Sequence, residues 1–301
     1  MFILIAGGTG SIGKYLSGHF LQAGHTVAVL SRNTEKHKLA KGVRIIAWDA
    51  KDTGPWVEAI EGCDVVINLT GKSVNCRYTR KNKYAILHSR TESTKALGKG
   101  LQQLKNPPKV WFNMSSATIY QHSEEYPNDE LTGIIGDDFS MNVCKAWEKS
   151  FYAVTLPETR KIVLRLAITL GMDGGVIPRY RNLVRFGLGG KMGSGNQMMS
   201  WVHALDVAMA IDFLIARDEL HGIFNIAAPH AVTNAAFMEA LRKDMHMPFG
   251  LPTPKWMLEI GAFLIGTETE LILKSRWVIP QKLLAAGYHF SYNRIEKAVH
   301  T

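Results

Sequence analysis

Cysteine is scarce in this sequence. The chain of 301 residues has three cysteines, Cys63, Cys76 and Cys144, and their spacing is not that of a disulfide framework or a zinc site. Single thiols are normal for a protein in a reducing compartment. We therefore expect a cytoplasmic protein with no structural metal.

Long apolar runs are missing as well. The most apolar stretches are MFILIAGG at the N-terminus and LEIGAFLIG at residues 258–266, and both are shorter than the roughly 20 residues that cross a bilayer. The first has no basic residues ahead of it and leads directly into glycines, which is typical of a strand and not of a signal peptide. We expect no membrane segment.

The chain also lacks a block of charge of one sign, although it is basic overall. It has 35 Lys and Arg against 26 Asp and Glu, a formal net charge of +9. The densest basic run, residues 77–90, has the composition of a solvated helix face, so we expect no nucleic acid partner. A basic balance suits a phosphate-bearing cofactor and a small, anionic substrate.

Short apolar runs alternate with amphipathic stretches through the first half of the chain. Near-continuous runs of this kind are typical of parallel strands that are buried on both faces. Their alternation with helices predicts an α/β fold, a Rossmann-type doubly wound parallel sheet. The runs are FILIAG, TVAVL, VRIIAW, DVVINLTG, KVWFNMSS and IVLRLAITLG.

The pattern changes after about residue 171. We expect a nucleotide-binding domain over residues 1–170 and a smaller, mainly helical substrate lobe over residues 171–301, with a soft boundary and with chain crossing between the two. The helices expected in the lobe span residues 177–188, 205–216, 234–246 and 254–265.

A glycine-rich stretch, GGTGSIG at residues 7–13, follows the first strand and opens a helix. Glycines let a pyrophosphate approach the backbone at a helix N-terminus, where free N–H groups and the helix dipole favour an anion. Because the pattern stands inside a βαβ unit, it predicts dinucleotide binding. The residues expected to contact the dinucleotide here are Gly7, Thr9, Gly10, Ser11, Ile12 and Gly13.

Residues at the end of the second strand indicate whether the dinucleotide is NAD or NADP(H). Ser31 and Arg32 stand where an NAD enzyme usually has an acidic residue for the ribose 2′-OH, and an arginine there accommodates a 2′-phosphate. We therefore predict NADP(H) in preference to NAD, the alternative being that Arg32 is a solvated loop residue. Asp49, after the third strand, is a candidate acceptor for the adenine amine or a turn residue.

Several motifs resemble a known family. GGTGSIG, NLTG at residues 68–71 and SSATIY at residues 115–120 are similar to the short-chain dehydrogenase/reductase superfamily, in its extended or atypical branch. CKAWE, GLGGKMGSGNQMMSWVHALDVA and VIPQKLLAAGYHF resemble its epimerase family 39U, over nearly the whole chain. The resemblance implies an NADP(H)-binding Rossmann domain, a C-terminal domain of unknown function and a relationship to nucleotide-sugar epimerases and dehydratases. It leaves the substrate open. The further cofactor contacts expected are Leu69, Gly71 and Ser115.

The catalytic residues of that superfamily are only partly present. A serine after the fifth strand polarises the substrate, and Ser116 fits this position. A Tyr-x-x-x-Lys pair on the next helix moves the proton, but FSMNVCKAWEK at residues 139–149 has no tyrosine. In one register the pair becomes Met141 and Lys145, and in the other it becomes Ser140 and Cys144.

Substitutes for the missing tyrosine can be named. Tyr120 is the candidate general acid because it follows Ser116 in a loop expected over the nicotinamide, and Lys145 is a candidate for the nicotinamide ribose. His203 is either a proton carrier or a structural histidine, and Asp206 is expected to anchor a loop. Candidates for an anionic substrate or for cofactor phosphates are Arg77, Ser89, Arg90, Arg165 and Arg276.

Two functions are compatible with these residues. The first is an NADP(H)-dependent oxidoreductase or epimerase that acts on a small or nucleotide-linked, sugar-like substrate with an altered acid/base group. The second is a non-catalytic NADP(H)-binding protein that uses the cofactor as structure or as a redox signal. The serine and the substrate lobe favour the first, and the missing tyrosine favours the second. A homodimer is left open.

Overall fold

A seven-stranded parallel sheet forms the core of the computed structural model, which describes residues 1–35, 39–172, 174–264, 266 and 268–300. The strand order is β10-β6-β5-β4-β1-β2-β3, and all neighbouring pairs are parallel. This confirms the predicted α/β fold with a Rossmann-type doubly wound sheet. The strands are β1 (Phe2–Ala6), β2 (Thr26–Ser31), β3 (Arg44–Ala47), β4 (Val65–Asn68), β5 (Val110–Ser116), β6 (Arg160–Leu166) and β10 (Gly222–Ile226).

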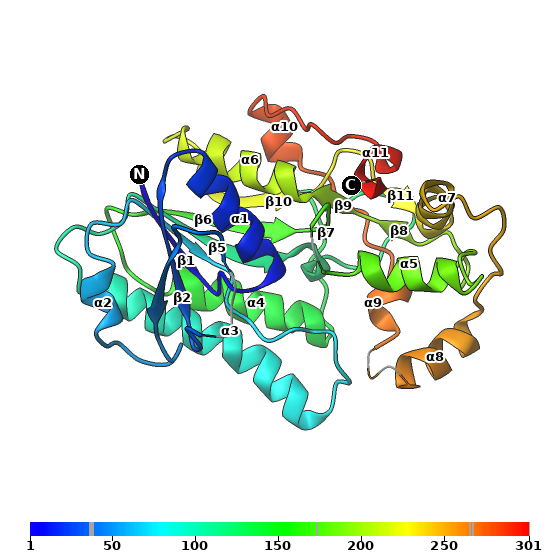
Figure 1. The fold of residues 1–301 in the computed structure, drawn as a ribbon, viewed down its shortest axis with the longest axis horizontal. Coiled ribbons are helices and arrows are strands. Elements are labelled where there is room, and N and C mark those ends of the chain that lie inside the picture. Colours follow the sequence, from blue (N-terminus) through cyan, green and yellow to red (C-terminus); the bar gives the residue numbers. More distant parts are fainter. Residues whose placement is uncertain (36–38, 173, 265, 267, 301) are drawn as a thin grey trace.

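Helices cover both faces of the sheet. α1 (Ser11–Gln22) and α6 (Ala204–Ile215) lie on one face, and α3 (Arg80–Leu101) and α4 (Phe139–Tyr152) lie on the other (Figure 1). Successive strand residues point to opposite faces. Ile3 and Ile5 of β1 therefore pack in one core cluster with Phe20 of α1, while Leu4 packs in the other with Leu97 of α3. Burial on both faces explains the continuous apolar runs.

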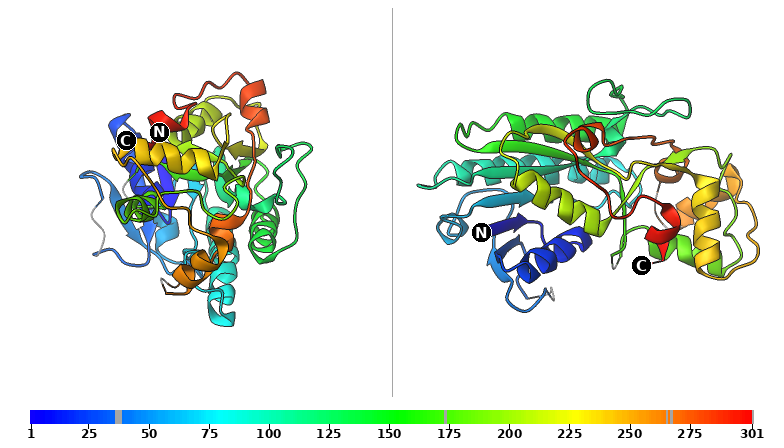
Figure 2. Two further views of the ribbon diagram at one scale, coloured as in Figure 1. Left: turned by 90° about the vertical axis from the view of Figure 1, so that its right-hand side faces the viewer. Right: turned by 90° about the horizontal axis from the view of Figure 1, so that it is seen from above.

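A smaller assembly lies at the carboxyl end of the sheet. In it β7 (Ile168–Leu170) pairs with β9 (Trp201–His203), and β8 (Met198–Met199) pairs with β11 (Val232–Thr233). It has its own apolar core, which includes Tyr180, Trp201 and Phe237. Figure 2 shows α7 and α8 at the end of the molecule away from the N-terminus. The remaining helices are α2 (Trp56–Ala59), the 3₁₀ turn η1 (Ala117–Ile119), α5 (Ile177–Arg185), α7 (Asn234–Asp244), α8 (Lys255–Leu264), α9 (Glu270–Leu273), α10 (Gln281–Ala285) and α11 (Ile295–Val299).

The chain passes between the sheet and the smaller assembly more than once. All six predicted strands form, and IVLRLAITLG is divided into β6 and β7. α6 and β10 come from the second half of the chain, yet they return to the large sheet. α5, α6, α7 and α8 correspond to the four helices expected there, although Ile265, the last residue of the fourth, lies outside the described residues. The division at about residue 170 stays a prediction.

No helix in the described parts of the chain has the length and apolarity needed to cross a membrane.

Candidate active site

The glycine loop connects β1 to α1. Gly7 has φ +76°, and a Cβ there would lie 3.0 Å from the backbone of Thr70, while a Cβ on Gly13 would collide with Gly8. These glycines are required by the chain itself. Gly10 is different, because a Cβ there would meet only the carbonyl oxygen of Gly7, at 3.8 Å. Gly10 is also the N-cap of α1 and offers no side-chain cap.

The loop therefore leaves open space at an uncapped helix N-terminus. Free N–H groups at such an end bind phosphate, and a missing Cβ lets it approach the backbone. The residues present fit the pyrophosphate of a dinucleotide. All six residues predicted for this contact lie in the loop or in the first turn of α1, namely Gly7, Thr9, Gly10, Ser11, Ile12 and Gly13.

A second hollow, of about 650 Å³, lies at the ends of β2 and β3, and its lining includes Arg32, Asp49 and Lys51. Oδ1 of Asp49 accepts the backbone N–H of Lys51 at 2.8 Å and of Asp52 at 3.1 Å. These bonds lower the pKa of Asp49. Asp49 is thus a turn residue, one of the two roles expected for it. Lys51 was not predicted, and it adds a second cation beside Arg32 in the same hollow.

The loop after β4 is held by a buried asparagine. Oδ1 of Asn68 accepts the N–H of Thr70 at 3.1 Å, and its Nδ2 donates to Thr94 at 2.9 Å and to Asn113 at 2.7 Å. A Cβ on Gly71 would lie 2.9 Å from the guanidinium carbon of Arg90, so a larger residue there would displace the Arg90 side chain. The NLTG motif thus fixes the backbone between β4 and the cleft.

The largest set of predicted site residues meets in one cleft of about 460 Å³. It lies at the carboxyl ends of β4 and β5, next to the first turn of α1, where ligands bind in open α/β sheets. Ser116 lines it and caps η1, since its Oγ accepts the N–H of Thr118 at 3.2 Å. The other predicted residues that line this cleft are Ile12, Leu69, Gly71, Ser115, Arg90 and Cys144.

The cleft face of α4 decides between the two registers. Ser140 and Cys144 line the cleft, whereas Met141 and Lys145 do not. Residues four apart share a helix face, and the cleft lining thus favours the register in which the pair is Ser140 and Cys144. Nζ of Lys145 lies 2.7 Å from the carboxylate of Asp137, near the surface. The structure thus places Lys145 outside the cleft that it was expected to serve.

Cys144 offers no reactive thiolate. Burial raises its pKa to about 11, so the thiol keeps its proton at neutral pH. Its side chain packs with those of Ala117, Ile119 and Tyr120. It packs in the wall of the cleft and does not replace the lysine chemically.

Tyr120 is buried below the cleft and does not line it. Its hydroxyl donates to Oδ1 of Asn225 and accepts from Nη1 of Arg165, both at 2.9 Å. Burial raises its pKa in spite of the arginine. The hydroxyl is thus occupied on both sides, and this geometry does not support the general-acid role expected for Tyr120.

The same network holds Ser115. Oγ of Ser115 donates to Glu148 at 2.6 Å, and Arg165 forms a fork with both oxygens of Glu148 at 3.0 and 2.9 Å. All three residues are buried. The network joins β5, α4 and β6. Arg165 is thus paired with Glu148 and is not available to bind an anionic ligand.

The remaining anion candidates differ in their partners. Arg77 pairs with Glu268 at 3.1 Å, and Oγ of Ser89 donates to the carbonyl of Ile86 at 3.1 Å. Arg90 stacks over Trp147, 5.1 Å from the ring centroid, and Nη1 donates to the carbonyls of Lys72 and Ile86.

Arg276 stands apart from the other candidates. Its Nε and Nη1 are buried and have no hydrogen-bond partner in the described structure. Its backbone is fixed by β8, because the N–H of Arg276 donates to the carbonyl of Met198 at 2.7 Å. Burial lowers its pKa, and the nearby carboxylate of Glu270 acts in the opposite direction. A cation held in place without a partner is what an anion site requires.

Tyr78 was missed as a site residue. It lies in the segment before α3 and lines the cleft, with its hydroxyl 3.4 Å from Oγ of Ser140. The sequence signal for its place is RYTRKN, in which Thr79 is the N-cap of α3 and accepts the N–H of Asn82. That signal marks a helix start, but it does not show which way the preceding tyrosine points.

His203 and Asp206 have structural roles. Nδ1 of His203 accepts the N–H of Leu205 at 3.1 Å, and its ring stacks on Tyr292 at 3.7 Å. Asp206 accepts the N–H groups of Ser291 at 2.7 Å and of Tyr292 at 2.9 Å. Asp206 thus anchors the C-terminal segment, as expected.

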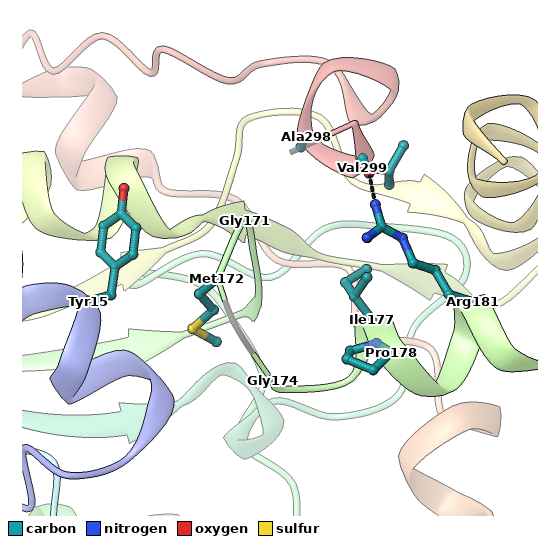
Figure 3. A pocket seen from close by; sticks show the side chains of 9 residues that line it. All are labelled: Tyr15, Gly171, Met172, Gly174, Ile177, Pro178, Arg181, Ala298 and Val299. Carbon is teal, nitrogen blue, oxygen red and sulfur yellow. Dashed lines mark hydrogen bonds between the residues drawn. The ribbon is translucent and has the colours of Figure 1, made fainter. Parts of the chain in front are cut away.

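Another hollow, of about 480 Å³, lies between α1, α5 and α11 (Figure 3). Arg181 reaches from α5 to the carbonyl of Val299 at 2.8 Å, and Tyr15 of α1 lies on the opposite side. Met172 lines this hollow and the cleft, so the segment after β7 separates the two.

Comparisons with known proteins agree with this architecture. The model of the NAD dependent epimerase/dehydratase family matches residues 3–227, and that of a domain of unknown function (DUF1731) matches residues 253–301. Epimerase family protein YfhF of Bacillus subtilis is 31% identical over 299 residues, which cover 99% of this chain and 97% of that protein. Human epimerase family protein SDR39U1 is 31% identical over 306 residues, covering 99% of this chain and 98% of its own.

Solved structures show the same likeness. The crystal structure of human SDR39U1 (isoform 2) with NADPH superposes with a TM-score of 0.87 at 30% identity, covering 100% of this chain and 98% of that one. UDP-glucose 4-epimerase of Thermus thermophilus, solved with NAD, has a TM-score of 0.77 at 18% identity over 100% of this chain and 97% of its own, and so shares the fold. The chain therefore belongs to the NAD dependent epimerase/dehydratase family and ends in a domain of unknown function shared with the SDR39U1 epimerase family proteins.

Proposed function

We propose that this protein is an NADP(H)-dependent oxidoreductase of the epimerase/dehydratase type, and that its substrate is an anionic carbonyl or hydroxyl compound such as a nucleotide-linked sugar. One observation carries the proposal. A single cleft brings together Ile12 from the dinucleotide loop, Ser116 at the end of β5 and the guanidinium-bearing Arg90.

The choice of NADP(H) rests on the hollow at the end of β2. Arg32 and Lys51 both line it, and a 2′-phosphate is favoured by a guanidinium and an ammonium group together. The human relative was solved with NADPH, which supports the same choice. When bound, the nicotinamide would supply or accept a hydride. Gly7 to Gly13 would hold the pyrophosphate, and Leu69, Gly71 and Ser115 would lie along the nicotinamide half.

The anionic substrate is inferred from Arg276. A buried guanidinium without an acceptor is costly, because its N–H groups have lost water and gained nothing in return. Arg276 is not among the residues that line the cleft, but its neighbours Tyr78 and Cys144 both line it. Carboxylate or phosphate oxygens would satisfy these two buried nitrogens. Arg90, which lines the cleft, supplies a further positive charge.

A non-catalytic role as an NADP(H)-binding protein is the second candidate function. It is favoured by the cleft face of α4, where Ser140 and Cys144 stand in place of the tyrosine and lysine of the superfamily. Neither side chain titrates near neutral pH in this site. The cofactor would then serve as structure or as a redox signal.

The two functions are separated by turnover. We expect the purified protein to bind NADPH and to oxidise it in the presence of at least one member of a panel of 2-oxo acids, sugar acids with a carbonyl group and nucleotide sugars. Ser116→Ala should lower kcat by roughly 100-fold, because a polarising hydrogen bond is lost, and leave NADPH affinity unchanged. Tight NADPH binding without turnover of any panel member would support the non-catalytic role and contradict the proposal.

A further inference from the structure

The cleft contains a phenol although α4 has none. The hydroxyl of Tyr78 lies 3.4 Å from Oγ of Ser140, the residue at the place of the superfamily's tyrosine. Ser140 has a short side chain, so space is left beyond it that a tyrosine at the same position would fill. Tyr78 reaches Ser140 from the segment before α3, and both residues line the cleft.

We propose that Tyr78 is the catalytic acid of this cleft and donates its phenolic proton to the substrate oxygen. The proposal rests on the oxidoreductase function proposed above. Tyr78 would then replace the missing tyrosine of α4 in space and not in sequence, which explains why helix spacing alone did not find it.

The phenol is held in a defined position. The Tyr78 ring meets that of Phe139 edge to face, with 5.0 Å between centroids, and its backbone N–H donates to Glu268 at 2.6 Å. Thr79 directly after it caps α3, which fixes the backbone on the other side. A held donor is a requirement of general acid catalysis, since the proton must be within hydrogen-bond reach of the reacting oxygen.

Burial keeps Tyr78 protonated at rest. It raises the pKa of Tyr78, the contact with Ser140 lowers it, and the carboxylates of Glu270 and Glu268 raise it further. Arg90 and Arg276 face it with positive charge. A protonated phenol can donate a proton but cannot accept one, so the resting cleft is prepared for reduction of a carbonyl group.

A hydrogen-bonded path can return the proton. Oγ of Ser140 donates to Glu270 at 2.7 Å, which leaves its lone pair to accept from Tyr78. The chain Tyr78, Ser140, Glu270 leads to a carboxylate that is partly exposed and lies 3.5 Å from Nζ of Lys274. After donation, the tyrosinate would take the proton of Ser140, which would be replaced through Glu270 by a proton from solvent.

The step balances in atoms and electrons. The carbonyl carbon gains a hydride from the reduced nicotinamide, the π pair of the C=O bond moves to oxygen, and the Tyr78 O–H bond breaks as the alcohol O–H bond forms. The carbonyl compound is reduced and the dinucleotide is oxidised. The other phenol considered for this role, that of Tyr120, has its hydroxyl hydrogen bonded to Arg165 and Asn225 below the cleft.

The position of the phenol can be tested without a substrate. Protein labelled with ¹³C at tyrosine Cζ is titrated by NMR alone, with NADP⁺ and with NADPH, and the Tyr78 signal is identified by its loss in Tyr78→Phe. We expect its titration midpoint to fall by about one pH unit or more with NADP⁺, because the oxidised nicotinamide is positively charged, and to fall less with NADPH. The control is Tyr84 on α3, which is 62% exposed and should not shift. An unchanged Tyr78 midpoint in protein saturated with NADP⁺ would overturn the proposal.

Turnover separates this inference from the proposed function. With any active panel compound, Tyr78→Phe should lower kcat by at least about 100-fold. NADPH affinity and Tm should stay at their wild-type values, and Tyr84→Phe should remain fully active. If Tyr78→Phe turns over substrate as fast as wild type, Tyr78 is not the catalytic acid, and the proposed oxidoreductase function is unaffected. If wild type turns over nothing, the proposed function fails, and the NMR titration still decides whether Tyr78 lies at the nicotinamide end.

Discussion

At the scale of single residues, two arginines show how partners decide the role of a cation. Arg165 is buried, but its guanidinium forms a fork with Glu148 and also donates to Tyr120. Nε and Nη1 of Arg276 are buried and have no acceptor within the described structure. The first pattern is typical of structure, because each of the three nitrogens of Arg165 donates a hydrogen bond. The second leaves a site that a ligand would complete.

The two arginines should respond oppositely to removal of charge. Arg165→Met leaves Glu148 buried without a partner, so we expect a loss of about 3 kcal/mol or more in the free energy of unfolding. Arg276→Met removes an unpaired cation, and we expect stability to be kept or to rise. Denaturant unfolding of both variants measures this. A large loss of stability in Arg276→Met would show that the guanidinium has a structural partner.

Arg32 should determine the preference between the two dinucleotides. Arg32→Asp replaces a cation by a carboxylate that repels the 2′-phosphate and accepts a ribose hydroxyl. We expect the NADPH-to-NADH affinity ratio to fall by roughly tenfold or more, from the about 1.5–3 kcal/mol of hydrogen bonds to a charged group. Fluorescence titration of both dinucleotides provides the ratio, with Arg185→Asp on α5 as the matched control. A ratio equal to that of wild type would refute the role of Arg32.

The cysteines provide a residue-scale check on burial. Burial raises the pKa of Cys63 to about 12 and that of Cys144 to about 11, so both should be thiols at pH 8. Cys76 is partly exposed. We expect a thiol-specific disulfide reagent at pH 8 to modify one thiol of the folded protein quickly and the other two only after unfolding. Rapid modification of Cys144, located by peptide mass, would contradict its burial in the wall of the cleft.

At the scale of elements, α4 shows what a sequence pattern could and could not provide. The resemblance to the superfamily predicted the helix, but with no tyrosine present two registers fitted. The cleft lining by Ser140 and Cys144 is a fact of helix rotation against β5 and cannot be read from residue types. Tyr78 was not predicted for the same reason. It lies outside any helix or strand, so only the folded structure shows that it lines the cleft.

Strands were predicted where burial leaves a continuous apolar run. β10 was missed because its sequence, GIFNI, is short and contains Asn225. This asparagine can be buried because Oδ1 accepts from Tyr120 and Nδ2 donates to the carbonyl of Ile279 at 3.0 Å. Its two partners lie 105 and 54 positions away in the sequence, so no local sequence pattern could predict that Asn225 is buried in a strand. The glycine loop was predictable because its chemistry is local.

The face of α4 also predicts what Lys145 does. Its Nζ pairs with Asp137 near the surface, so Lys145→Ala should leave NADPH affinity within about twofold of wild type. Isothermal titration with NADPH measures this, and Trp147→Ala, on the cleft face, serves as the contrasting variant that should weaken binding. If Lys145→Ala loses more NADPH affinity than Trp147→Ala does, Lys145 contacts the cofactor after all.

At the scale of the whole molecule, the C-terminal segment belongs to the same folded unit as the sheet. Leu283 and Tyr288 lie in the core cluster of the sheet, and Ile295 and Val299 lie in that of the smaller assembly. Glu130 accepts the backbone N–H of Asn225 at 2.8 Å and of Lys282 at 3.3 Å, which joins the segment to β10. The segment also supplies Arg276 to the cleft region.

Removal of the segment should therefore unfold more than its own residues. A chain that ends at residue 252 loses apolar side chains from both core clusters, and we expect it to lack a cooperative thermal transition and to bind no NADPH. Circular dichroism melting measures the transition. A truncated chain that melts cooperatively and binds NADPH would show that the domain matched at residues 253–301 is separable.

The most direct test of the proposed oxidoreductase with an anionic substrate is NADPH oxidation with matched pairs of compounds. Each pair consists of a carbonyl compound that bears a carboxylate or phosphate and its neutral amide or dephosphorylated counterpart, measured with wild type and with Arg276→Gln. We expect wild type to turn over an anionic member at least about tenfold faster than its neutral partner, and Arg276→Gln to lose that difference. Tight NADPH binding with no turnover of any member, or equal turnover of both members by wild type, would contradict it.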